Sequence, residues 1–220
     1  GPPERDPAAV AERLLAVQGQ DPRGARLAVR ARSEGLTAAD VDRALSEERS
    51  LLITWLNRGT LHLVRSEDYP WLQALTTPPL LTSAKRRLAQ EGVSPDDAER
   101  GLATIERALA DEGPLTRLQL RERLDVAGVP TDGVLIHLLF LAAVRGIAVR
   151  GPMVGSQHAY VLVEDWLGPQ KPLDRDTALA ELARRYLFGH APANDRDLAR
   201  WAGLPLRDAR AGLAAIGSGL

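Results

Sequence analysis

The stretch LLITWLNRGTLHLV, residues 51–64, holds two apolar, partly β-branched runs on either side of Asn57-Arg58-Gly59. Two such runs around a short polar centre with a glycine predict a β-hairpin. Three short helices are expected before the hairpin. Helices followed by a hairpin in this order are typical of a winged-helix unit, so residues 1–65 are predicted to form one.

Capping residues mark the helices that precede the hairpin. Asp6-Pro7 and Asp21-Pro22 each place an N-cap residue before a proline at the first helical position. The second of these helices is expected to run to about Gly35, which serves as a C-terminal stop. Thr37-Ala-Ala-Asp40 resembles a capping box and predicts a third helix through about Glu48.

The same order of elements recurs along the chain. Residues 66–112 are predicted to be a helical connector, with Ser66 and Ser94 as caps. Residues 113–168 predict a second winged-helix unit, with a helix capped by Thr116, an apolar helix over 131–145 and a two-stranded wing. In residues 174–220, APANDRDL repeats the pattern of GPLTRLQL. The chain ends where a third wing would begin. We expect a mainly α fold with small β-hairpin wings, in tandem winged-helix domains of which two are complete and the third is truncated.

The composition is that of an ordinary globular protein and narrows the chemistry. Of 220 residues, 45% are hydrophobic and 26% are charged, and the formal net charge is −1, so a DNA-binding face has to be a local patch. The absence of cysteine excludes disulfides and thiolate chemistry. The four histidines lack metal-ligand spacing, and we expect no metal and no cofactor. No signal peptide or membrane span is recognised, which predicts a cytoplasmic protein.

Gln18 and Gln20 in the segment QGQ are the candidate catalytic residues. On an α-helix they point to nearly opposite sides, whereas in an extended segment they project to the same side. Gly19 and the new helix start at Asp21-Pro22 favour a break here. Two amides can orient a water but do not titrate, so they suit a reaction whose leaving group is already activated. The alternative is a polar corner between helices, which a motif this short does not exclude.

Three groups of residues are candidate DNA contacts. Arg23, Arg26 and Arg30 form a basic stripe on the second helix. Thr60 and His62 share one face of a strand beside Arg58, although the hairpin is equally compatible with packing on its own domain. Lys85 and Arg86 begin a small basic cluster, for which a solvated helix face is the alternative.

LLAVQGQDPRGARLAVRAR, followed by LITWLNRGTLHLVRSEDYPWL, resembles the AlkZ/YcaQ family of bacterial winged-helix DNA glycosylases, and most closely its Q-x-Q branch. VRGPMVGSQHAYVLVEDW and DRDLARWAGLP extend the likeness over most of the chain. The resemblance implies a monofunctional glycosylase for bulky N-alkylated purines, including those in interstrand crosslinks. It assigns the catalytic pair to Gln18 and Gln20 and places the hairpin over residues 58–62 near the lesion. Gly19 departs from the apolar residue or alanine that is usual between the glutamines.

The implied chemistry agrees with two neutral amides. Alkylation at purine N7 makes the base cationic and weakens its glycosidic bond, so the enzyme has to place a water and favour an oxocarbenium-like sugar. We expect double-stranded DNA as the partner, a monomeric protein, and an open cleft without a tight base pocket. A non-catalytic winged-helix regulator and a protein-interaction module are the alternatives. The apolar helix over 131–145 argues against the regulator, which needs a polar reading helix.

Overall fold

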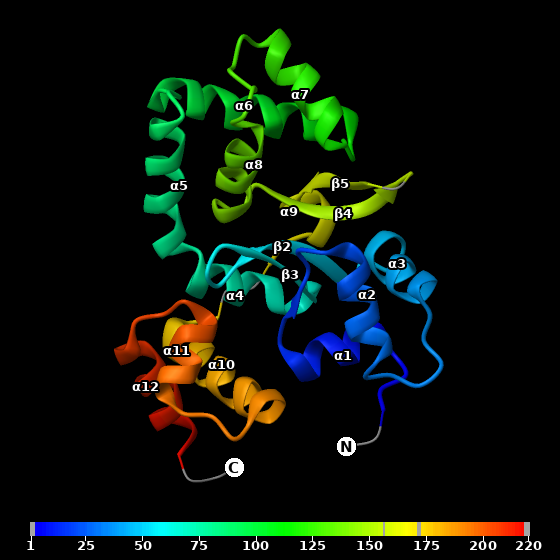
Figure 1. The fold of residues 1–220 in the computed structure, drawn as a ribbon, viewed down its shortest axis with the longest axis vertical. Coiled ribbons are helices and arrows are strands. Elements are labelled where there is room, and N and C mark those ends of the chain that lie inside the picture. The colour runs from blue at the N-terminus through cyan, green and yellow to red at the C-terminus, as the bar shows by residue number, and fades with distance from the viewer. Residues whose placement is uncertain (1–2, 156, 171–172, 218–220) are drawn as a thin grey trace. The chain divides into compact units, whose positions relative to one another are not determined.

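The computed structural model describes residues 3–155, 157–170 and 173–217, which form two compact units. The first unit joins residues 1–77 with residues 170–220, and the second consists of residues 78–169. The protein is mainly helical with short antiparallel strands, as the sequence predicts (Figure 1). The number of winged-helix repeats stays a prediction.

The first unit combines two distant stretches of sequence. Its elements are α1 (Pro7–Leu14), β1 (Val17–Gln18), α2 (Pro22–Arg30), α3 (Ala38–Ser46), β2 (Leu51–Leu56), β3 (Thr60–Arg65), the 3-10 turn η1 (Ser66–Asp68), α4 (Tyr69–Thr76), α10 (Arg175–His190), α11 (Asp195–Ala202) and α12 (Leu206–Ile216). The predicted hairpin is confirmed as β2 and β3, and β1 pairs antiparallel with the other side of β3. Every residue of β2 is buried, so this small sheet forms the centre of the unit.

The helix starts follow the predicted caps with one exception. The predicted caps Asp6, Asp21, Ser94 and Thr116 each accept a hydrogen bond from the first turn of the helix that follows, and Asn194 does the same for α11. The capping box that begins at Thr37 is also present. The exception is the expected Ser66 cap, which is wrong. The Ser66 hydroxyl donates to the Arg49 carbonyl instead, and α4 begins at Tyr69 without a side-chain cap.

Helix α2 is shorter than expected. It ends at Arg30 rather than near Gly35, because the chain beyond it forms a bridge with the N-terminal segment. The Glu4 N–H donates to the Arg32 carbonyl, and the Glu34 N–H donates to the Glu4 carbonyl. These backbone bonds replace the helical ones and leave Arg32 just outside the helix.

Helix α10 anchors the C-terminal stretch of this unit to its N-terminal half. Its Arg185 forms an ion pair with Asp68, with 2.5 Å between the guanidinium and carboxylate atoms. The same guanidinium donates to the Glu12 carbonyl at 2.7 Å. Gly212 of α12 packs so closely on the Leu179 carbonyl of α10 that a side chain there has no room. The predicted third repeat is therefore part of the same compact body as the first.

The second unit is a smaller helical body with its own hairpin. Its elements are α5 (Pro78–Gln90), α6 (Pro95–Glu112), α7 (Arg117–Val126), α8 (Leu135–Val144), β4 (Ala148–Val154), β5 (Gln157–Leu162) and α9 (Val163–Leu167). Helix α8 begins at Leu135 instead of Thr131, because residues 131–134 form a turn that Thr131 closes with its carbonyl. Most of α8 is buried. Within the part of the chain that the structure describes, no helix is both long and apolar enough to cross a bilayer.

Candidate active site

The segment that carries Gln18 and Gln20 is not helical: Gln18 ends strand β1, and Gln20 lies two residues beyond it. Helix α1 ends at Leu14, and Leu15 takes a positive φ of 65° that turns the chain out of the helix. Gln18 then pairs with His62 of β3, and the Gly19 N–H donates to the Leu61 carbonyl at 2.7 Å. Burial alternates along this segment, with Gly19 buried between two exposed glutamines. Both glutamine side chains are therefore exposed and line one cavity, as a break in the helix predicts.

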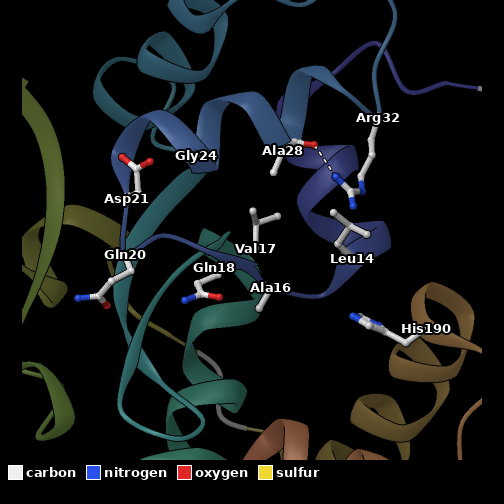
Figure 2. A pocket seen from close by; sticks show the side chains of 10 residues that line it. All are labelled: Leu14, Ala16, Val17, Gln18, Gln20, Asp21, Gly24, Ala28, Arg32 and His190. Atoms are coloured by element: carbon white, nitrogen blue, oxygen red, sulfur yellow. Dashed lines mark hydrogen bonds between the residues drawn. The ribbon is translucent and has the colours of Figure 1, made fainter.

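Strand β3 holds the side chain of Gln20. The Leu61 N–H donates to the Gln20 Oε1 at 3.3 Å. That contact fixes the end of the side chain and leaves its NH₂ group and one oxygen lone pair for a ligand. Figure 2 shows both glutamines at the edge of the same cavity.

His62 lies directly opposite Gln18 in the antiparallel pair, so the two side chains project from the same face of the sheet. It is buried, and its Nδ1 lies 2.9 Å from the Thr60 carbonyl oxygen. Burial lowers the pKa of His62 to about 4, with a smaller contribution from the positive charge of Arg58. The ring is therefore neutral at pH 7 and adds no charge beside Gln18.

The start of α2 forms a second wall of the cavity. Asp21 caps this helix by accepting from the Arg23 N–H at 3.0 Å. Gly24 lies close to that carboxylate. A Cβ built at this position would be 3.1 Å from the Asp21 Oδ2. Beyond the end of α2, the Arg32 guanidinium donates to the Ala28 carbonyl at 3.1 Å (Figure 2).

The end of α10 forms the third wall and places a histidine across the cavity from the glutamines (Figure 2). His190 lies beside the end of α1 because Gly189 packs on the Arg13 carbonyl, where a Cβ would come within 2.5 Å of the oxygen. The cavity has a volume of about 540 Å³ and opens to solvent. Its lining residues are Leu14, Ala16, Val17, Gln18, Gln20, Asp21, Gly24, Ala28, Arg32 and His190.

The three arginines predicted as a stripe on α2 lie outside this lining. Arg23 and Arg30 are exposed. Arg26 forms an ion pair with Asp42 of α3 and also donates to the Pro22 carbonyl at 2.8 Å. Asp42 neutralises the charge of Arg26 within the protein. Of the three arginines, Arg23 and Arg30 are therefore the ones available to bind a phosphate.

The hairpin residues predicted to meet DNA make contacts inside their own unit. Arg58 donates to the Arg200 and Trp201 carbonyls at 2.8 and 3.0 Å. These carbonyls end α11, where the helix dipole favours a cation. Thr60 is partly buried and holds His62 through its carbonyl. The hairpin thus has the packing expected of a wing docked on its own domain, and contact with DNA at these residues stays a prediction.

Lys85 and Arg86 are exposed on α5 of the second unit.

The cavity-lining residues that the sequence did not predict are in the first unit. Arg32 and His190 line the cavity although neither belongs to a recognisable motif. Arg32 lies twelve residues after Gln20 in the same segment, but His190 is brought in by tertiary packing alone. In the described ranges, no group of His, Asp and Glu side chains is arranged to hold a metal ion.

The sequence and the fold match a known family of DNA glycosylases. The chain is a member of the AlkZ-like DNA glycosylase family, whose sequence model, described as "DNA glycosylase AlkZ-like", matches residues 11–219. It is 31% identical over 214 residues to an interstrand DNA cross-link repair glycosylase from Streptomyces sahachiroi, a match that covers 92% of this chain and 57% of that protein. The solved structure of Streptomyces sahachiroi DNA glycosylase AlkZ superposes with a TM-score of 0.77 at 25% identity, over 98% of this chain and 60% of the other. The chain thus spans about three fifths of the length of these relatives.

Proposed function

We propose that this protein is a monofunctional DNA glycosylase of the Q-x-Q type, which excises N7-alkylguanine-type purines and unhooks interstrand crosslinks. The observation that carries the proposal is that Gln18, at the end of β1, and Gln20, two residues further on, both line one open cavity. Membership of the AlkZ-like family and the name of the Streptomyces relative support the choice of reaction.

The reaction replaces the bond between the sugar C1′ and the purine N9 by a bond to water. Because N7 alkylation gives the purine a positive charge, the departing base takes the electron pair of the C1′–N9 bond and becomes neutral. The sugar passes through an oxocarbenium-like state, which the amide oxygens of Gln18 and Gln20 stabilise while they orient the water. Leu61 keeps the Gln20 oxygen in place, so less reorganisation is needed at the moment of reaction.

Asp21 adds a negative charge at the edge of the cavity. Its carboxylate caps α2, and among the described residues that line the cavity it is the only acidic group. The Asp21 carboxylate favours a cationic substrate and a cationic transition state over a neutral one, and the Arg32 guanidinium in the same lining acts in the opposite direction. In this scheme the leaving group is activated by its own charge, so the reaction requires no cofactor.

The open cavity suits a base that remains attached to the opposite strand. Many glycosylases rotate the base into a closed pocket, which a crosslinked purine cannot enter. We propose double-stranded DNA with alkylated or crosslinked purines as the partner, a monomer as the active form and the cytoplasm as the location. Exposed Arg23 and Arg30 are the proposed phosphate contacts closest in sequence to the glutamines, and Arg58, Thr60, His62, Lys85 and Arg86 remain candidate contacts.

A non-catalytic regulator of the winged-helix type is the competing function. It needs a helix whose polar side chains read the major groove, whereas α8 is apolar and mostly buried. Incubation of the protein with duplex DNA that carries one defined N7-alkylguanine crosslink separates the two functions. Abasic sites revealed by alkali cleavage support the glycosylase, and salt-sensitive binding without abasic sites supports the regulator.

A further inference from the structure

Three polar side chains follow one another across the small sheet of the first unit. Gln18 of β1 lies opposite His62 of β3, and His62 in turn lies opposite Thr54 of β2. Residues directly opposite one another in a sheet project from the same face. His62 is therefore the middle member of this row, with Gln18 on one side and Thr54 on the other.

Gln18 and His62 form the close type of antiparallel pair. The Gly19 N–H donates to the Leu61 carbonyl at 2.7 Å, so the backbone hydrogen bond falls on the pair of Gly19 and Leu61. The neighbouring pair of Gln18 and His62 is then of the non-hydrogen-bonded type, in which the Cα atoms are typically about 4.5 Å apart and the side chains are closest. The Gln18 amide is therefore within reach of the His62 ring.

The His62 ring offers one free acceptor. Its Nδ1 lies 2.9 Å from the Thr60 carbonyl oxygen, and a carbonyl only accepts, so Nδ1 carries the proton and the lone pair is on Nε2. Burial keeps the ring neutral at pH 7, since it lowers the pKa of His62 to about 4. In the part of the chain that the structure describes, no residue bonds to Nε2. The buried Thr54 hydroxyl beside the ring has no partner there either.

The Gln18 amide has two orientations, and one of them suits the reaction. Gln18 is exposed at the edge of the cavity (Figure 2), and no described residue bonds to its amide. The amide oxygen has to face the water and the cationic sugar, whereas the NH₂ group carries partial positive charge and opposes that cation. A partner for the NH₂ group on the side away from the substrate would select the productive orientation.

Building on the proposed function, we propose that His62 is the positioning residue for Gln18. When DNA is bound, His62 Nε2 accepts a hydrogen bond from the Gln18 NH₂ group and so directs the Gln18 oxygen toward the substrate. The His62 side chain is buried and does not line the cavity, so it acts through Gln18. Leu61, the preceding residue of β3, already holds the Gln20 oxygen at 3.3 Å, and one strand thereby orients both amides.

The test compares two replacements of His62 that differ in one acceptor. A glutamine side chain reaches as far as the imidazole Nε2, whereas asparagine reaches only as far as Nδ1. The measurement is the single-turnover excision rate at pH 7.5, with saturating protein and a duplex that carries one N7-methylguanine. His62→Asn should be slower by about tenfold or more, and His62→Gln should recover most of that loss. Thr54→Val, on the other side of the ring, is the matched control and should keep the wild-type rate.

A double-mutant cycle shows whether His62 acts through Gln18. In Gln18→Ala, the further replacement His62→Asn should cost less than about twofold, because the amide that it orients is gone. If the full loss persists there, or if His62→Asn and His62→Gln are equally slow, the ring has a general structural role and the inference is wrong. A loss that vanishes instead in Gln20→Ala would show that His62 serves the other amide, which also overturns it.

Two measurements separate this inference from the function on which it rests. A wild type that produces no abasic sites overturns the proposed function. In an active wild type, the ¹⁵N resonances of the His62 ring should show a proton on Nδ1 and none on Nε2. A proton on Nε2 would overturn the role of His62 alone, and this result does not depend on the folding of any variant. If His62→Asn differs from wild type only below saturating protein, His62 is a DNA contact and does not orient Gln18.

Discussion

Replacement of Arg185 by glutamine is expected to destabilise the first unit strongly. The Arg185 and Asp68 side chains are only 6% and 8% exposed, and their charged atoms are 2.5 Å apart. Removal of one partner of a buried pair typically costs about 3–5 kcal/mol, because the other charge stays buried without compensation. Arg65 lies 3.7 Å from the second oxygen of Asp68 and offsets part of this loss. The Glu12 carbonyl loses its donor as well, and we expect Arg185→Gln to lower the free energy of unfolding by about 3–4 kcal/mol.

Urea denaturation at pH 7, followed by tryptophan fluorescence, measures this change. Trp71 is a local reporter because its ring lies 5.8 Å from the Arg185 guanidinium carbon. Arg184→Gln is the matched control, since the neighbouring Arg184–Glu181 pair is 53% and 30% exposed and should contribute less than about 1 kcal/mol. A double-mutant cycle with Asp68→Asn should give a coupling of about 2 kcal/mol or more. A coupling below about 0.5 kcal/mol would refute the view that this pair anchors α10.

Three further changes have defined outcomes. Because the pKa of His62 is about 4 in the folded state and 6.5 for an exposed histidine, the unfolded state binds one more proton than the folded state between these pH values. Stability should therefore fall by about 3 kcal/mol from pH 6.5 to pH 4 in wild type and less in His62→Gln, as urea titrations at several pH values can show. Asp21→Ala removes the cap of α2 and should cost about 1 kcal/mol, and a thermal melt unchanged from wild type would contradict the cap. Arg23→Gln should weaken DNA binding and reduce its salt dependence, whereas Arg26→Gln should mainly lower stability because it breaks the pair with Asp42. DNA affinity is measured by titration at several salt concentrations. Equal losses in Arg23→Gln and Arg26→Gln would show that the ion pair with Asp42 does not prevent Arg26 from binding DNA.

The local elements were predictable from the sequence because each depends on residues close together in the chain. The hairpin follows from two apolar runs around Asn57 and Gly59, both of which have the positive φ that such a turn needs. The extended QGQ segment follows from the new helix start at Asp21-Pro22. Ser66 shows the limit of this approach, since a serine before a helix reads as a cap but its hydroxyl is taken by the Arg49 carbonyl.

The tertiary features of the site were not predictable in this way. His190 reaches the cavity because Gly189 fits against the Arg13 carbonyl, and nothing in either segment alone indicates that contact. Arg26 fits the periodicity of a basic stripe, but Asp42 on a different helix binds its guanidinium. Residues 174–220 look like an independent repeat, yet they belong to the stretch 170–220 that packs in one unit with residues 1–77. Each of these features depends on contacts between segments that are far apart in the sequence. Local patterns in a single sequence do not indicate such contacts.

Gln18 and Gln20 are the proposed catalytic residues, and the replacement of each one alone tests that role. The measurement is the single-turnover rate of abasic-site formation on a duplex with one N7-alkylguanine crosslink, for wild type, Gln18→Ala, Gln20→Ala and the exposed control Gln90→Ala. Loss of a group that acts mainly in the transition state typically lowers the rate by about 100-fold or more. We predict such a loss for each of Gln18→Ala and Gln20→Ala, with DNA affinity within about threefold of wild type, and no change for Gln90→Ala. Wild-type rates in both glutamine variants would contradict the proposed role of Gln18 and Gln20 in excision.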